Sequence, residues 1–259
     1  MGSNIQISTR GERHLNAVIG NTEFKQHYCQ KLTRKWQEEL SMLSKIGTIQ
    51  PQAAYTCYTS GYQHKFSYYL RTIPGIEKYL AEVEQTIRHS FIPAITGGHI
   101  VNDDERTLLS LPPRLGGLGI KILTETAPIE FTNSMNLTIK LQNEIKRTQT
   151  EAAEKTIGQI KGDRRTNYNM QLTAIKEKMT HEQRRLNESS RETGASNWLT
   201  SLPLKDLGYD LNKQQFWDAK YPIWLVTIKI AICLCLWQQF QHSAFALMQE
   251  RWFCDFTSQ

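Results

Sequence analysis

Apolar residues recur every three or four positions through most of residues 21–147, which is the spacing of one buried face of an α-helix. The first such stripe follows Asn21, a residue type that caps helices, and reaches Gly47, which is typical of a helix end. Its members are Phe24, Tyr28, Leu32, Trp36, Leu40 and Leu43. A helix with one apolar side is not stable alone in water, so this helix is expected to pack against others.

Three further stripes follow before residue 111. One predicts a helix from Pro51 to about Arg71, and another predicts a helix that opens at Pro74 and is stopped by Pro93 and by Gly97-Gly98. Asn102, with a glutamate three residues later, predicts a capping box at the start of a short fourth helix.

Two features flank this group of helices. On the C-terminal side, a later helix is predicted to start at Pro128 and to carry apolar residues as far as Ile145. On the N-terminal side, short alternating or apolar runs at 4–8 and 12–20 predict a small β element. The predicted fold class is therefore mainly α, a helical bundle with a small N-terminal β element and a long basic helix. We expect residues 1–147 to form the β element and the bundle.

Residues 148–194 lack proline and are rich in Glu, Lys, Arg and Gln. Their apolar residues form a narrow stripe that predicts one long helix or a short coiled coil, with Glu182 interrupting it. Residues 140–191 hold 12 Lys/Arg against 7 Asp/Glu, so much of the net charge of +6 lies here. The stripe consists of Tyr168, Leu172, Ile175, Met179 and Leu186.

The segment Leu108–Ile120, which reads LLSLPPRLGGLGI, combines helix-breaking prolines, permissive glycines and apolar residues that require burial. It predicts a rigid, buried corner. No P-loop or dinucleotide-binding fingerprint surrounds its glycines, so the segment is interpreted as structural. The signature residues are Pro112, Pro113, Arg114, Gly116, Gly117 and Gly119.

Candidate metal and membrane segments both fall near the C-terminus. The apolar run 222–237 is shorter than the ~20 residues that cross a bilayer, so no membrane partner is expected. Four residues of the same region are candidate zinc ligands, which is the alternative interpretation. The turn residues that normally orient metal ligands are missing there. No cofactor is predicted. The four residues are Cys233, Cys235, His242 and Cys254.

Six segments together resemble reverse-transcriptase reading frames of eukaryotic retroelements, in the region that follows the polymerase palm. The resemblance covers about residues 5–219, although Asn16 stands where the family usually has glycine. The matching segments are residues 13–20 (RHLNAVIG), 23–61, 68–76 (YYLRTIPGI), 91–97 (FIPAITG), 108–120 and 194–219, which begins GASNWLTSLPL.

This resemblance implies a thumb- and connection-like region that grips a template–primer duplex. The catalytic aspartates of the family lie upstream of the matched region, so no catalytic residue and no polymerase activity are expected. The family continues past residue 219 into a Cys-x-Cys-Gly segment. The codons permitted by Ile232 to Gln259 can spell such a segment after a shift of one base, so we interpret residues 221–259 as an out-of-frame tail.

Two functions remain open at this point. The first is sequence-independent binding of RNA or DNA, duplex or single-stranded, through basic residues on exposed helix faces. The second is a helical scaffold that self-associates through the stripe at 168–186, with residues 195–220 as a short helical connection. The five cysteines and the lack of a secretory signal favour an intracellular protein, cytoplasmic or nuclear. The candidate contacts are Lys31, Arg34, Lys35, Arg164, Arg165, Arg184 and Arg185.

Overall fold

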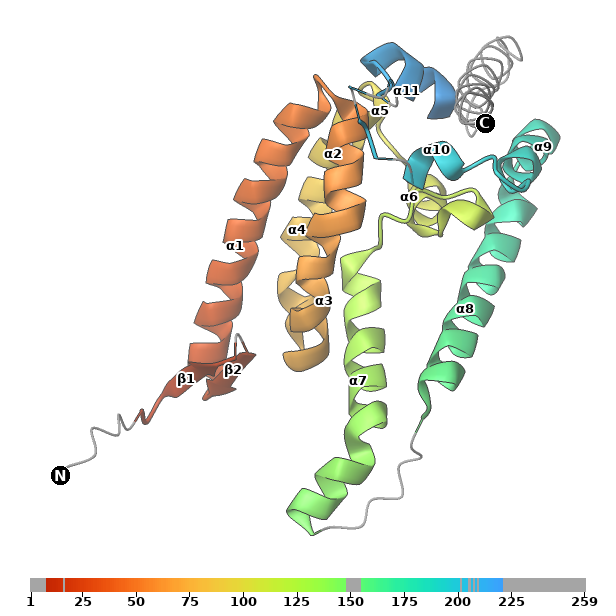
Figure 1. The fold of residues 1–259 in the computed structure, drawn as a ribbon. Coiled ribbons are helices and arrows are strands. Elements are labelled where there is room, and N and C mark those ends of the chain that lie inside the picture. The colour runs from red at the N-terminus through yellow and green to blue at the C-terminus, as the bar shows by residue number, and fades with distance from the viewer. Residues whose placement is uncertain are drawn as a thin grey trace, which may run out of the picture.

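A computed structural model describes residues 8–15, 17–147, 155–200, 202–204, 206, 208 and 210–220. Within these ranges the chain is mainly helical, with one small antiparallel sheet near the N-terminus, as the sequence predicts (Figure 1). Three predictions fall outside these residues: the zinc alternative, the apolar run 222–237 and the out-of-frame tail 221–259. Most of the predicted strand at 4–8 also lies outside them.

The hairpin of β1 (Gly11–His14) and β2 (Ala17–Gly20) leads directly into the first long helix, α1 (Thr22–Gly47). Its register pairs Gly11 with Gly20 and His14 with Ala17. Asn21 caps α1, because its side-chain oxygen accepts the N–H of Phe24 at 2.8 Å, and α1 ends at Gly47 as predicted. A Cβ on Gly47 would lie 3.1 Å from Ile95, so this glycine also lets α1 approach a neighbouring helix closely.

The second and third predicted helices exist, but each contains a π-helical turn. Helix α2 (Pro51–Cys57) continues through η1 (Tyr58–Tyr62) into α3 (Gln63–Thr72). The third begins as the 3-10 turn η2 (Ile76–Tyr79) and continues through α4 (Ala81–Thr86), the π turn η3 (Ile87–Phe91) and α5 (Ile92–Thr96).

The prediction that Pro93 stops the third helix is wrong. Pro93 lies in the first turn of α5, and the helix ends only where Gly97 adopts a left-handed φ of 76°. The π turn just before Pro93 changes the hydrogen-bond pattern from i−4 to i−5, so a residue without an N–H is tolerated at this point.

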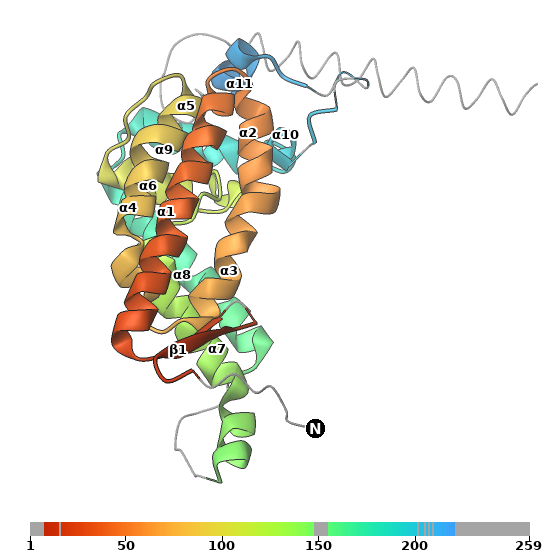
Figure 2. The ribbon, with the colours of Figure 1, turned by 90° about the vertical axis from the view of Figure 1, so that its left-hand side faces the viewer.

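The main core lies between α1, the α2–α3 rod and the α4–α5 rod, which run side by side in both views (Figures 1 and 2). It is built on fully buried aromatic rings. Trp36 meets Phe66 edge-on with centroids 4.9 Å apart, and Tyr58 stacks on Phe91 at 4.6 Å. Such aromatic pairs stabilise the fold beyond the burial of their apolar area, and they prefer a defined ring geometry.

Helix α6 (Asp103–Ser110) starts with the predicted capping box, in which Asn102 and Glu105 exchange hydrogen bonds of 2.9 Å. The next helix, α7 (Leu123–Lys146), corrects a prediction, because it starts at Leu123 and contains Pro128 in its interior. Pro128 is exposed, so water can satisfy the helical carbonyl that loses its N–H partner there.

The predicted long helix of residues 148–194 is in fact two helices, α8 (Ile157–Lys178) and α9 (His181–Ser190). The break occurs at Met179, whose ψ of 144° is extended, and Thr180 then forms a capping box with Gln183. A side-chain cap competes with helix continuation at this point. Residues 179 and 186 therefore do not lie on one continuous helix.

Two short helices complete the described chain, α10 (Asn197–Thr200) and α11 (Lys213–Lys220). Asn212 and Gln215 make a reciprocal cap, with bonds of 3.0 and 2.9 Å. Leu199 and Phe216 are buried in the main core, and α2 contacts both helices. The last short helices therefore share the core of the bundle.

Candidate functional site

The segment Leu108–Ile120 turns the chain from α6 into α7 and hydrogen-bonds to itself within the turn. The N–H of Gly119 donates to the carbonyl of Leu111 at 2.8 Å, and the N–H groups of Leu118 and Ile120 both donate to Leu109 at 3.1 Å. The hydroxyl of Tyr55 donates to the carbonyl of Leu118 at 2.8 Å. These bonds satisfy backbone groups that burial removes from water.

The glycines of this segment meet two different requirements. Gly116 and Gly119 adopt φ values of +84° and +68°, which residues with a Cβ rarely reach. At Gly117 the requirement is space, because a Cβ there would lie 2.1 Å from the carbonyl oxygen of Leu111. None of these geometries presents a cradle of N–H groups to a phosphate, because the N–H groups of residues 116–119 donate to the chain itself.

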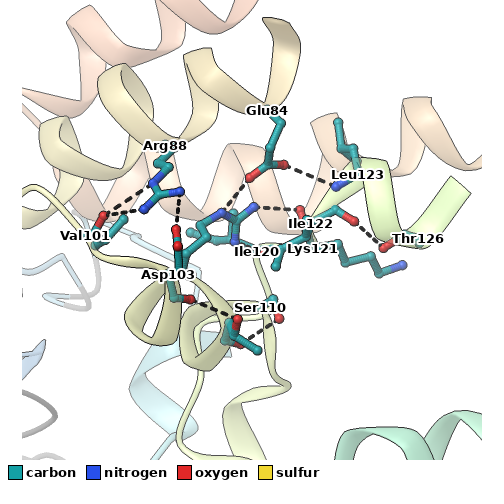
Figure 3. A network of polar contacts seen from close by, with 12 residues as sticks. Glu84, Arg88, Val101, Asp103, Ser110, Ile120, Lys121, Ile122, Leu123 and Thr126 are labelled. Atoms are coloured by element: carbon teal, nitrogen blue, oxygen red, sulfur yellow. Dashed lines mark hydrogen bonds and ion pairs between the residues drawn. The ribbon is translucent and has the colours of Figure 1, made fainter. Parts of the chain in front are cut away.

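Arg106 holds this turn to the bundle, a role that was not predicted from the sequence. Its Nε lies 2.7 Å from Glu84 of α4, while its Nη1 and Nη2 donate to the carbonyls of Ile120 and Lys121 at 2.7 and 3.0 Å (Figure 3). The side chain is only 4% exposed. A signal was present in the sequence, since Arg106 lies three residues before buried Leu109 on the apolar side of the helix.

The stripe on α8 packs against the same turn. Leu172 and Ile175 form a small second core with Leu108, Leu111 and Leu115. From α9, the amide of Asn187 donates to the carbonyl of Leu115 at 3.2 Å. The described part of the stripe is therefore already used within the chain.

The candidate basic residues fall on two separate sides of the molecule. Lys31, Arg34 and Lys35 are exposed on α1. The other four belong to α8 and α9, and the two ribbon views place α1 and α8 on opposite sides of the bundle (Figures 1 and 2). One continuous surface does not include both groups.

Two of the four arginines on α8 and α9 make contacts within the chain, although Arg184 is itself exposed. Arg164 pairs with Glu130 at 2.5 Å, and Arg184 donates to the carbonyls of Lys176 and Glu177 at the end of α8. A cation near the C-terminal end of a helix is stabilising, because the carbonyls there carry partial negative charge. Arg165 and Arg185 are exposed.

Glu130 of α7 is the centre of a basic cluster that was not predicted from the sequence. Arg71 from α3 donates to one of its oxygens at 3.0 Å, and Arg164 from α8 donates to the other. Glu130 is only 7% exposed on its side chain. Burial lowers the pKa of nearby Lys121; Glu130 opposes this effect, while Arg164 and Arg71 add to it. Desolvation disfavours the charged form of an amine.

The described residues contain no group of three or more His, Cys, Asp or Glu side chains arranged to hold a metal ion. Among the same residues, no helix is both long and apolar enough to cross a membrane. No family model, curated protein or solved structure matches this chain.

Proposed function

We propose that this chain is a thumb- and connection-like part of a retroelement reverse transcriptase that lacks the catalytic carboxylates of the polymerase. It binds RNA or DNA without sequence preference and does not polymerise DNA by itself. The site of action is intracellular, cytoplasmic or nuclear. The sequence resemblance motivates the assignment to a reverse transcriptase, and the surface of α1 supports nucleic-acid binding.

The observation that carries the binding proposal is the position of three basic residues on α1. Arg34 and Lys35 lie three and four residues after Lys31, so both neighbour Lys31 on one side of the helix, and all three residues are exposed. Glu38 is an exposed carboxylate one turn further on, which leaves an excess of two positive charges. The β hairpin lies against the start of this helix (Figures 1 and 2).

A row of exposed cations on a helix binds the phosphate backbone by releasing condensed counterions, without reading bases. Such binding weakens steeply with salt and tolerates any sequence. The expected ligand is therefore a duplex or single strand recognised through its phosphates.

The decisive experiment measures the salt dependence of binding to a labelled duplex. The variant Lys31→Gln/Arg34→Gln/Lys35→Gln removes three cations while keeping good helix-forming residues. Each lost phosphate contact should reduce the slope of log K against log salt by about 0.9. The matched control Lys140→Gln/Lys146→Gln/Arg147→Gln removes the same number of exposed charges at the end of α7 and should keep most of the slope.

Equal slopes in the two triple variants would overturn the role of α1, and binding that is insensitive to salt would overturn the role of phosphate contacts. The assignment to a reverse transcriptase has a separate test in the coding DNA. We expect the shifted frame after residue 219 to encode the Cys-x-Cys-Gly segment. A coding sequence without that segment contradicts the out-of-frame interpretation of residues 221–259.

The scaffold alternative has less support. Self-association through 168–186 needs an exposed apolar stripe, but Leu172 and Ile175 are buried against the turn that follows α6. We therefore expect sedimentation of the purified chain to show no oligomer that forms through this stripe. An oligomer of that kind would grow with protein concentration and would be abolished by Leu172→Ala. Such an oligomer would favour the scaffold.

A further inference from the structure

Three cations surround one carboxylate where α3, α7 and α8 meet. Arg71 and Arg164 each bind a different oxygen of Glu130, at 3.0 and 2.5 Å. Lys121 lies just before α7, and its electrostatic interactions with Glu130, Arg71 and Arg164 place it in the same group. The group carries an excess of two positive charges. We call these four residues the Glu130 cluster.

The cluster keeps unused hydrogen-bond donors. Arg71 bonds Glu130 only through Nε, and Arg164 only through Nη2. Figure 3 shows the side chain of Lys121 extending away from Glu84, and its ammonium has no hydrogen-bond or ion-pair partner among the described residues. The terminal Nη groups of Arg71 are equally without a partner within that part of the chain.

Two further residues extend the cluster toward the glycine-rich turn. Tyr168 of α8 is partly buried and packs against the second core. Burial raises the pKa of its hydroxyl, and nearby charges modify this shift: Arg164 lowers the pKa, Glu130 raises it and Arg114 lowers it. Arg114 itself is exposed. A neutral hydroxyl donor and a fourth cation thus adjoin the same group.

A half-buried lysine beside two arginines, with no hydrogen-bond or ion-pair partner among the described residues, is an unfavourable arrangement in isolation. Burial removes hydration from the ammonium, and two like charges repel it, while the one carboxylate is shared by both arginines. A phosphate monoester, with close to two negative charges near neutral pH, would balance the cluster, and a backbone phosphodiester, with one, would balance half of its excess. Free guanidinium and ammonium donors bind phosphate oxygens through charge-assisted hydrogen bonds, and phosphate offers several acceptor oxygens to donors that approach from different helices.

We propose that the Glu130 cluster is a phosphate-binding site, in which Lys121, Arg71 and Arg164 contact the phosphate and Glu130 positions the two arginines. The phosphate belongs either to a free phosphorylated molecule or to a nucleic-acid backbone. This site is separate from the surface of α1, and it does not depend on the proposed function.

The test uses the full chain and two probes. Inorganic phosphate is titrated and its binding followed by phosphorus NMR, at constant ionic strength with chloride as the competing anion. A labelled thymidine oligonucleotide is titrated separately in the background of the α1 triple variant, so that α1 does not contribute. Binding of phosphate alone indicates a free phosphorylated ligand, and oligonucleotide binding that depends on Lys121 indicates a nucleic-acid backbone.

The key variant is Lys121→Met, which keeps the length of the side chain and removes the charge. We expect Lys121→Met to reduce the affinity for whichever probe binds by about tenfold or more. Such a loss is typical of removing one charge-assisted contact. The control Lys140→Met removes an exposed lysine of α7 and should leave affinity unchanged. Equal affinities of the two variants would overturn the proposal, as would a wild-type chain that binds neither probe.

A second variant covers the case in which Lys121→Met does not fold. Glu130→Gln removes the central negative charge but keeps an amide oxygen that accepts from one arginine. The cluster then has an excess of three positive charges, so phosphate should bind severalfold more tightly. A folded Glu130→Gln variant whose phosphate affinity equals that of wild type contradicts the site.

Discussion

Arg106 and Glu84 form an ion pair, with Nε 2.7 Å from Oε1, that joins α4, α6 and the start of α7 at one point (Figure 3). Both partners also bind backbone groups of the chain between α6 and α7. Arg106 donates to the carbonyls of Ile120 and Lys121, and Glu84 accepts the N–H of Leu123 at 3.2 Å. The pair therefore fixes where the turn ends and α7 begins.

Replacement of Arg106 by methionine should strongly destabilise the fold. It leaves the Glu84 carboxylate and two carbonyls without their partner, and breaking one side of a buried pair costs about 3–5 kcal/mol. Urea unfolding followed by circular dichroism measures the loss.

Arg88→Met is the matched control, because Arg88 pairs with Asp103, which is 89% exposed. An exposed pair contributes about 0–1 kcal/mol. Arg88 also donates to the carbonyl of Val101 at 3.1 Å, and a hydrogen bond from a charged donor adds about 1.5–3 kcal/mol, so Arg88→Met should lose less stability than Arg106→Met. Equal losses in the two variants would show that the Arg106 pair has no special role.

Gly117→Ala should destabilise the turn after α6 by several kcal/mol. The new Cβ would lie 2.1 Å from one backbone oxygen and 2.5 Å from another, so the backbone must move. Gly162→Ala provides the opposite case, because a Cβ on this helical glycine would meet no neighbouring group within 4 Å. It should stabilise α8 by roughly 0.5–1 kcal/mol. Thermal unfolding of both variants checks the sign, and a neutral Gly117→Ala would contradict the packing of the turn.

Leu172→Ala should loosen α8 from the turn. Leu172 is buried in the small core with Leu108 and Leu115, and truncation of a buried leucine costs about 2–5 kcal/mol. Met170→Ala, on the exposed side of the same helix, should change stability by less than about 0.5 kcal/mol. Hydrogen exchange in α8 reports the local effect; unchanged protection in Leu172→Ala would show that this contact does not hold the helix.

Cys29 should react far more slowly than Cys57 with iodoacetamide near neutral pH. Cys29 is buried on α1, and burial raises the pKa of its thiol to about 11, whereas Cys57 is exposed. The neutral thiol persists below that pKa, so the reactive thiolate fraction is about a hundredfold lower than for an ordinary cysteine. Mass spectrometry of the two peptides measures the rates. Both thiols should react alike in denaturant, and equal rates in the native protein would contradict the burial of Cys29.

Local patterns in the sequence determine most of the helices and several of their ends. The caps at Asn21 and Asn102 form as predicted, because a cap needs only a side chain and the N–H groups two or three residues ahead. The apolar stripes likewise determine which side of each helix is buried. Both are properties of neighbouring residues, and the mainly α fold follows from them.

Tertiary structure decides the features that depend on distant partners. Pro93 and Pro128 lie within helices because a π turn and an exposed helix face tolerate them, although proline by itself predicts a helix boundary. The basic residues of α1 and α8 lie on opposite sides, and the stripe on α8 is buried by the turn after α6. The contacts of Arg106 and of the Glu130 cluster join residues 14 to 59 positions apart along the chain. Helical periodicity relates only residues within a few turns of each other, so it determines the elements of this protein, whereas packing between elements determines which charges meet.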